Sequence, residues 1–143
     1  MNVEAILKGK GRAVATVAPE ASIADAVALL RKKGIGALVV SRTGDDVAGI
    51  LSERDIVHAL AERGAQMLEL QVSVLMTRHV FTCQPGDKIA ELMAQMTERR
   101  IRHLPVVEDG KLAGIVSIGD VVKNRVDEVE EEASSLRQFI TSA

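Results

Sequence analysis

The sequence predicts a mixed α/β (α+β) fold: two β-α-β-β-α units packed about a pseudo-twofold axis, with a long C-terminal helix. Two observations predict it. Residues 49–55 (GILSERD) return as residues 114–120 (GIVSIGD), and residues 14–60 align with residues 80–125 at a shift of 66, or 65 after Gly44. A register kept over a whole unit indicates a tandem duplication. A unit of about 50 residues is marginal alone, so the two copies are expected to pack together.

The two copies predict the same secondary-structure elements in the same order. A short extended segment, VATVAP or VFTCQP, ends at a proline, which cannot continue a strand ladder. A helix follows, opened by Ser22 or by Asp87, with apolar residues at i, i+3, i+4 and i+7. Two strands come next, GALVVS and VAGILS or HLPVVE and LAGIVS, joined by TGDD or by EDGK with its Asp-Gly hairpin signal. A second helix is expected over residues 53–63 and from Ile118 onward.

The remaining segments complete the division of the chain. We expect an N-terminal helical segment (1–13), a first repeat (14–63), a connector (64–78), a second repeat (79–125) and a C-terminal helix extension (126–143). The connector breaks at Gly64 and has no Pro/Gly-rich run, so it is expected to pack, with a short turn after Ser73.

The C-terminal extension carries a heptad-like apolar stripe. Its positions follow spacings of 4, 3, 4, 3 and 4, with Phe139 beside them: Val122, Val126, Val129, Ala133, Leu136 and Ile140. The stripe predicts a homodimer formed through this helix. The alternative is that it folds back on its own core, against Ile6 and Leu7.

Composition limits the class of function. The 143 residues are 47% hydrophobic but only 1% aromatic, so the core is expected to be aliphatic. A net charge of −2 and the lack of aromatic platforms argue against nucleic-acid binding. No segment approaches a membrane span or a signal peptide, and the single cysteine excludes an intrachain disulfide, so a cytoplasmic protein is expected, with no membrane partner.

The order of elements and three motifs resemble the CBS domain pair, named after cystathionine β-synthase and also called the Bateman module. The motifs are VLMTRHVFTCQP, MTERRIRHLPVVEDGKLAGIVSIGDVV and GILSERDIV, and the resemblance covers about residues 14–125. It implies a non-catalytic, stand-alone regulatory module that senses energy or redox state and signals to an unidentified regulated protein. Its implied ligands are adenosine-containing: AMP, ADP, ATP, NAD or S-adenosylmethionine.

The resemblance also implies two ligand clefts between the copies. In each, the motif aspartate holds the ribose hydroxyls, the serine lies near the phosphate, and the second strand meets the adenine edge. Carried over to this chain, the first cleft takes Thr16, Gly36, Ala37, Leu38, Ser52, Arg54 and Asp55. The second cleft takes Thr82, Arg102, His103, Leu104, Pro105, Ser117, Ile118 and Asp120. The resemblance further favours side-by-side dimers.

Physical chemistry supports the two motif residues independently. A carboxylate is a charged acceptor suited to a vicinal diol, and charge-assisted hydrogen bonds are about twice as strong as neutral ones. A serine at a helix start places its hydroxyl beside free N–H groups, where the helix dipole favours an anion. Arg54 aligns with Gly119, and Gly36-Ala37 aligns with Arg102-His103, so the two clefts are expected to be unequal. The side chains that could reach a phosphate lie on the helix in the first cleft and on the strand in the second.

Several alternatives remain open at this stage. Ser52 and Ser117 would cap helices without any ligand, and Arg54 could be a solvated surface charge. The protein could be a structural or interaction protein with vestigial clefts, or an S-adenosylmethionine-binding module. An enzyme is not expected, because no nucleophile–base pair, Walker-type loop or metal-ligand spacing is visible; Cys83 is interpreted as a small buried residue.

Overall fold

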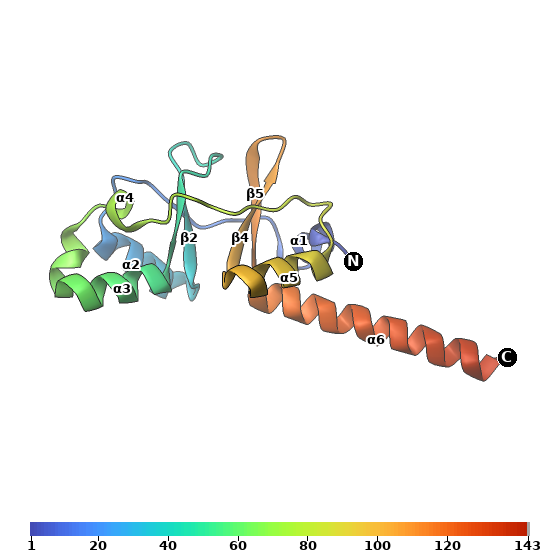
Figure 1. The fold of residues 1–143 in the computed structure, drawn as a ribbon. Helices are drawn as coiled ribbons and strands as arrows, with labels where there is room; N and C mark the ends of the chain where they lie inside the picture. Colours follow the sequence, from blue (N-terminus) through green and yellow to red (C-terminus); the bar gives the residue numbers. More distant parts are fainter. Residues whose placement is uncertain (143) are drawn as a thin grey trace.

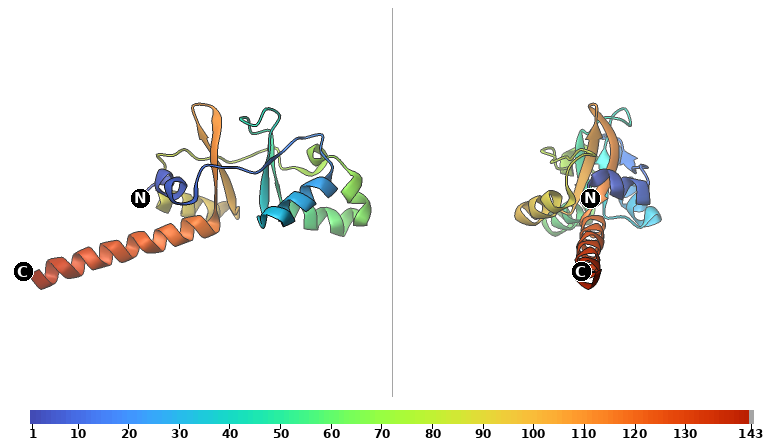
Figure 2. Two further views of the ribbon diagram at one scale, coloured as in Figure 1. Left: turned by 180° about the vertical axis from the view of Figure 1, so that it is seen from behind. Right: turned by 90° about the vertical axis from the view of Figure 1, so that its right-hand side faces the viewer.

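The computed structural model describes residues 1–142 as two α/β halves, with a helix before the first half and a long helix after the second. The two sheets stand side by side, and the final helix α6 projects away from them (Figure 1; Figure 2). Ala143, the last residue of the predicted extension, lies outside the described residues. The mixed α/β architecture and the long C-terminal helix are therefore as predicted.

The first half contains β1 (Thr16–Val17), α2 (Ile23–Lys33), β2 (Ala37–Val40), β3 (Gly49–Ser52) and α3 (Glu53–Arg63). β2 lies between β1, which runs parallel to it, and β3, which runs antiparallel. Ser22 opens α2 as predicted, since its Oγ accepts the N–H of Asp25 at 3.1 Å. Gly34 ends α2 in the left-handed conformation that glycine tolerates best.

The second half contains α5 (Ile89–Arg99), β4 (His103–Glu108), β5 (Lys111–Ser117) and α6 (Ile118–Ser142). β4 and β5 form an antiparallel hairpin whose turn has positive φ at Asp109 and Gly110, as the Asp-Gly signal predicts. The VFTCQP segment makes only an isolated parallel bridge between Cys83 and Val106. Burial and then the nearby Asp87 carboxylate raise the pKa of Cys83 to about 12, so it is an inert buried thiol.

The predicted opening of α5 by Asp87 is wrong. The N-cap of α5 is Lys88, which makes no side-chain capping bond. The Asp87 carboxylate instead turns back into the loop before the helix, where Oδ2 accepts the N–H of Gln84 at 2.8 Å. Asp87 therefore stabilises a turn rather than the helix start.

Each half has its own apolar core, completed by the segment that precedes the other half. α1 (Val3–Lys10) places Val3, Ile6 and Leu7 in the core of the second half. The connector, which comprises the 3-10 helix η1 (Gly64–Glu69) and α4 (Val72–Leu75), contributes buried apolar side chains to the first half; these are Met67, Val72 and Met76. The two halves thus exchange their leading segments.

Backbone hydrogen bonds show that α1 and α4 are themselves repeated elements. The N–H of Val3 donates to the carbonyl of Asp87 at 2.9 Å, and the N–H of Val72 donates to the carbonyl of Ala21 at 2.8 Å. Ala21 and Asp87 occupy matching positions of the repeat. The connector therefore packs, as predicted, but Ser73 lies inside a helical turn rather than before one.

α6 remains separate from the domain over most of its length. Val121 is fully buried in the second core, whereas the large side chains of the predicted stripe from Val122 to Ile140 are exposed. The alternative that the stripe folds back on the core is thus wrong, because Ile6 and Leu7 are already covered by the second half. None of the helices within residues 1–142 is long and apolar enough to cross a membrane.

Candidate functional site

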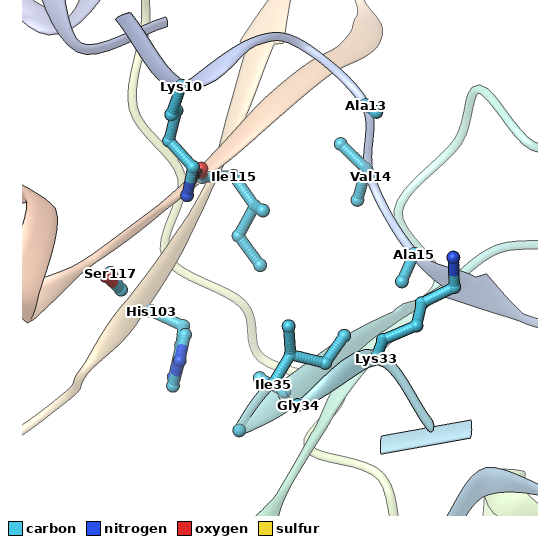
Figure 3. A pocket seen from close by; sticks show the side chains of 12 residues that line it. Lys10, Ala13, Val14, Ala15, Lys33, Gly34, Ile35, His103, Ile115 and Ser117 are labelled. Atoms are coloured by element: carbon cyan, nitrogen blue, oxygen red, sulfur yellow. Dashed lines mark hydrogen bonds between the residues drawn. The ribbon is translucent and has the colours of Figure 1, made fainter. Parts of the chain in front are cut away.

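Two clefts lie between the halves and share one wall, formed by Gly36 and His103. The larger, of about 630 Å³, is called the Lys10 cleft; it is lined by Lys10, Ala13, Val14, Ala15, Lys33, Gly34, Ile35, Gly36, Ala37, His103, Ile115 and Ser117 (Figure 3). The smaller, of about 390 Å³, is called the Arg54 cleft; it is lined by Gly36, Ile50, Ser52, Glu53, Arg54, Asp55, Val57, His58, Thr77, Arg100, Ile101, Arg102 and His103.

Each cleft combines the motif of one half with the strand start of the other. Ser52 and Asp55 share the Arg54 cleft with Arg102, whereas Ser117 shares the Lys10 cleft with Ala37. The predicted grouping by half is therefore wrong for Arg102 and Ala37. The physical reason is the packing of the halves, which places the helix start of one opposite the strand start of the other.

Several other residues from the predicted sets are placed away from the clefts. Leu38, Leu104 and Pro105 are buried in strands, and Thr82 is exposed on a loop. Seven of the predicted residues do not line either cleft: Thr16, Leu38, Thr82, Leu104, Pro105, Ile118 and Asp120. Asp120 nevertheless contacts the lining, through Lys10.

In the first motif, Ser52 and Asp55 form a reciprocal capping box. The Oγ of Ser52 accepts the N–H of Asp55 at 3.4 Å, and Oδ2 of Asp55 accepts the N–H of Ser52 at 2.9 Å. The Thr77 hydroxyl donates to the other oxygen, Oδ1, at 3.2 Å. The capping role is confirmed, and it holds a carboxylate with spare lone pairs at the Arg54 cleft.

The second motif is capped in the same way but carries an added charge. Oδ2 of Asp120 accepts the N–H of Ser117 at 2.9 Å, and the N–H of Asp120 donates to Oγ of Ser117 at 3.2 Å. Lys10 Nζ donates to the same Oδ2 at 2.7 Å and to the carbonyl of Ile115 at 3.1 Å. Burial of Asp120 favours its neutral form, but the bonds from Lys10 and Ser117 outweigh it and hold its pKa below the ordinary value.

Lys10 and Thr77 therefore occupy matching places in the two clefts. Each comes from the segment leading into one repeat and reaches the motif aspartate of the other. The ammonium of Lys10 neutralises Asp120, whereas the hydroxyl of Thr77 leaves the charge of Asp55 in place. This difference has no counterpart in the GILSERD and GIVSIGD motifs themselves.

Basic side chains are distributed unequally. The Arg54 cleft contains Arg54, Arg100 and Arg102, and the Lys10 cleft contains Lys10 and Lys33, which lie on opposite sides of it in Figure 3. The expectation that Arg54 and Arg102 serve different clefts is wrong. Arg54 is also more than a solvated charge, since its guanidinium donates to the carbonyl of Arg100 in the other half at 3.0 Å.

His103 forms the wall between the clefts. Burial lowers its pKa; Glu53 opposes this, while Lys10 and Arg102 add to it. A Cβ on Gly36 would lie 3.4 Å from Cε1 of His103, so the imidazole lies directly against Gly36. A charge placed in either cleft would lie near this ring.

Sequence reasoning missed six lining residues that carry polar or charged groups: Lys10, Lys33, Glu53, His58, Thr77 and Arg100. Arg100 had a usable signal, because it aligns with Gly34 and both end a helix with positive φ. Lys10 had none, because it lies before the aligned unit. Within residues 1–142 no group of three or more His, Cys, Asp or Glu side chains could hold a metal ion.

Comparison with known proteins agrees with the fold. The CBS domain profile matches residues 11–62 and 72–127. The structure of a CBS-domain containing protein from Agrobacterium tumefaciens is 49% identical, with a TM-score of 0.84, over 87% of this chain and 99% of that one. A CBS domain pair crystallised with 5′-methylthioadenosine and S-adenosyl-L-methionine is 26% identical, with a TM-score of 0.78, over 90% of this chain and 98% of that one.

A mitochondrial CBS domain-containing protein from Arabidopsis thaliana is 37% identical over 123 residues, which are 83% of this chain and 60% of that protein. This chain thus spans less than two thirds of the length of that relative. The two profile matches cover both repeats and the α4 segment, and the identities to CBS-domain proteins extend over most of the chain. The chain belongs to the CBS domain family, as a tandem CBS pair.

Proposed function

We propose that this CBS pair is a non-catalytic regulatory module that binds an adenosine-containing nucleotide, AMP, ADP, ATP or NAD, in its clefts and signals energy or redox state to a partner protein. One observation carries the proposal: a capping box fixes Asp55 in the Arg54 cleft, and a second capping box fixes Asp120 beside the Lys10 cleft, where it contacts the lining residue Lys10. A fixed carboxylate is suited to accept both hydroxyls of a ribose. In the Lys10 cleft, a ribose would displace or share the contact of Lys10.

The cations favour a phosphate-bearing ligand over S-adenosylmethionine. Lys10 and Lys33 in one cleft and three arginines in the other provide charge-assisted donors for phosphate oxygens. The sulfonium of S-adenosylmethionine is itself positive and would be repelled. S-adenosylmethionine remains the second candidate, because a CBS pair of similar fold was crystallised with it.

We further propose a homodimer and an unidentified regulated protein as partners, with the cytoplasm as the compartment expected from composition. The Arabidopsis relative is described as mitochondrial, so the compartment stays a prediction. If the clefts are vestigial, the chain is instead a structural or interaction protein. Calorimetry and thermal shifts with AMP, ADP, ATP, NAD and S-adenosylmethionine distinguish these functions, since a ligand at a hundred times its Kd stabilises by about 2.7 kcal/mol.

The ribose assignment is tested by Asp55→Asn and Asp120→Asn, which keep an oxygen for the cap but remove the charge. We expect each to weaken nucleotide binding at its cleft by roughly 1.5–3 kcal/mol, the range for hydrogen bonds to charged groups. Asp25→Asn is the matched control, because Asp25 also lies three residues after a capping serine but neither lines a cleft nor bonds to a residue that does. Unchanged affinity in both cleft variants would refute the assignment, and no binding across the panel would favour vestigial clefts.

A further inference from the structure

α6 presents a continuous apolar stripe that its own domain leaves open. The helix runs for 25 residues from Ile118 to Ser142. The large apolar side chains along the stripe and beside it are between 39% and 72% exposed: Val122, Val126, Val129, Leu136, Phe139 and Ile140. Exposed apolar surface of this extent on one helix face is typical of an interface.

The domain-facing side of α6 is a different side. Val121 is buried in the core, and Glu128, two turns further on, forms an ion pair with the N-terminal ammonium of Met1 at 2.7 Å. At 3.6 residues per turn, the stripe through Val122 and Val129 lies about a quarter of a turn away from this side. Because Val122 is itself 39% exposed, a second helix can lie along the stripe from its first residue. α6 runs from beside the domain to well beyond it (Figure 1).

We propose that a second copy of this chain covers the stripe, with the two α6 helices paired parallel and in register as a short coiled coil. The 4-3 spacing places Val122, Val129 and Leu136 at d positions and Val126, Ala133 and Ile140 at a positions. This pairing specifies the homodimer of the proposed function and does not depend on nucleotide binding.

Charge complementarity selects the parallel direction. In a parallel coiled coil, each g residue faces the e residue five positions later on the partner helix. Here the g residues Arg125 and Glu132 would face Glu130 and Arg137, so both contacts on each side join opposite charges. Such contacts set partner orientation in coiled coils.

The antiparallel arrangement joins like charges instead. In the register that keeps all six core positions in contact, Glu130 meets its own copy and Glu132 meets its own copy. Lys123 meets Arg137 in the same arrangement. All three contacts are repulsive, so the flanking residues act against an antiparallel pair as well as in favour of a parallel one.

The attachment of α6 to the folded domain favours pairing of a helix this short. An isolated helix of this length must overcome its own nucleation cost, but α6 is continuous with the helix start capped by Ser117 and Asp120 and is held by Val121. At 1.5 Å per residue, the stripe from Val122 to Ile140 offers about 27 Å of contact.

Light scattering and analytical ultracentrifugation on the full chain test the pairing. We expect a dimer at micromolar concentration, a monomer for Leu136→Asp, and an unchanged dimer for the control Ser134→Asp, which lies on a face of the helix away from the stripe. Leu136 is 60% exposed within the chain, so its substitution should leave the fold intact. A monomeric wild type overturns the homodimer, whereas a dimer that survives Leu136→Asp overturns only the pairing through α6.

The orientation is tested by charge exchange. Glu132→Lys should raise the dimer Kd at least tenfold, because the introduced ammonium would face the guanidinium of Arg137 on the second copy, and adding Arg137→Glu should restore the wild-type value. Within its own helix the introduced lysine forms a favourable pair, since residue 132 lies four positions after Glu128. A loss of dimer affinity therefore reports on contacts with the second copy. An antiparallel pair would instead leave the single variant unchanged, which would overturn the proposal.

A disulfide provides a second measure of orientation. Leu136→Cys should form a reducible dimer under mild oxidation, because a parallel register places the two copies of residue 136 together. The native thiol, Cys83, is buried and does not compete. Ser134→Cys is the matched control and should stay unlinked. If Leu136→Cys forms the disulfide only when Val126→Cys is also present, the helices are antiparallel, which overturns the parallel pairing. Nucleotide binding measured on the same samples distinguishes a failure of the pairing from a failure of the proposed function.

Discussion

At the scale of single residues, the two clefts differ in the group that meets the motif aspartate. We expect Lys10→Met to raise the pKa of Asp120 toward or above its ordinary value of 3.8, because burial favours the neutral acid and Lys10 is the strongest of the contacts that oppose it. Carboxyl-detected NMR titration measures this change. Lys8→Met, on an exposed position of the same helix, is the control and should leave the Asp120 titration unchanged.

The same variant changes stability with a defined pH dependence. Because the folded-state pKa of Asp120 lies below its ordinary value, its ionised form stabilises the fold above pH 3.8, and this contribution is lost as pH falls through the folded-state pKa. The pair with Lys10 is partly exposed, so we expect Lys10→Met to cost only about 0.5–1 kcal/mol at neutral pH. Urea unfolding should show this cost shrinking below pH 3.8; a cost independent of pH would show that Lys10 acts through packing.

His103 should couple nucleotide binding to proton uptake. Burial lowers its pKa, Glu53 and Asp120 act in the opposite direction, and a bound phosphate in either cleft would add negative charge beside the ring and raise the pKa. We therefore expect binding to take up protons and to tighten as pH falls through the ordinary histidine pKa of 6.5, because the free protein holds the pKa of this imidazole below that value. Calorimetry in buffers of different ionisation enthalpy measures the uptake.

His79 provides the control for that experiment. It lies at an exposed position against Phe81 and lines neither cleft. We expect His103→Gln to abolish the proton uptake and His79→Gln to retain it. Equal uptake in both variants would assign the linkage to another group.

At the scale of elements, two glycines set how closely the exchanged segments approach the sheets. A Cβ on Gly49 would lie 2.7 Å from Sδ of Met76 and 2.9 Å from the carbonyl oxygen of Thr77, whereas a Cβ on Gly114 would meet only the side chain of Leu7. The carbonyl of Thr77 cannot retreat without losing its bond from the N–H of Ile50 at 3.0 Å. The first approach is therefore the more rigid of the two.

We expect Gly49→Ala to destabilise the protein by roughly 1–3 kcal/mol, the range for overpacking, and by more than Gly114→Ala. Gly9→Ala should have the opposite sign and stabilise by about 0.5–1 kcal/mol, because no atom lies within 4 Å of its Cβ position and alanine favours helix. Urea unfolding measures all three. A smaller cost at Gly49 than at Gly114 would mean that the segment around Thr77 is more mobile than its hydrogen bonds to Ile50 indicate.

The elements of the two repeats could be predicted because their apolar periods and caps are local in the chain. The correspondence of α1 with α4 could not be predicted, because their sequences share little beyond Val3 and Val72. The spacing to the repeat also differs, since Leu7 is separated from Val14 by more residues than Met76 is from Val80. Both segments do place apolar residues at i, i+3 and i+4, which was the available signal. Which half supplies each cleft wall depends on packing between the halves. The sequence could therefore identify the motif residues but could not assign them to the correct cleft.

At the scale of the whole molecule, the exchange of leading segments ties the stability of each half to the other. α1 leads into the first repeat but buries Val3, Ile6 and Leu7 in the second, and the connector does the converse through Val72 and Met76. Direct bonds add to this tie, since the N–H of Leu112 donates to the carbonyl of Asp45 at 2.7 Å. Neither half can therefore unfold without exposing apolar surface of the other.

We accordingly expect the two halves to unfold as one unit, although each has a separate core. Ile23→Ala, in the first core, should cost about 2–5 kcal/mol and should accelerate amide exchange in β4 and β5 of the second half by the same free energy as in β2. The measurement is native-state hydrogen exchange by NMR, because the chain has no Trp or Tyr to report unfolding by fluorescence. The solvent-exposed Ala28→Gly, which costs about 1 kcal/mol of helix propensity, tests whether a small perturbation in the same half spreads equally far. If exchange in β4 and β5 stays unchanged while β2 loses protection, the halves are independent domains, and binding in one cleft would reach the other only through the wall of Gly36 and His103.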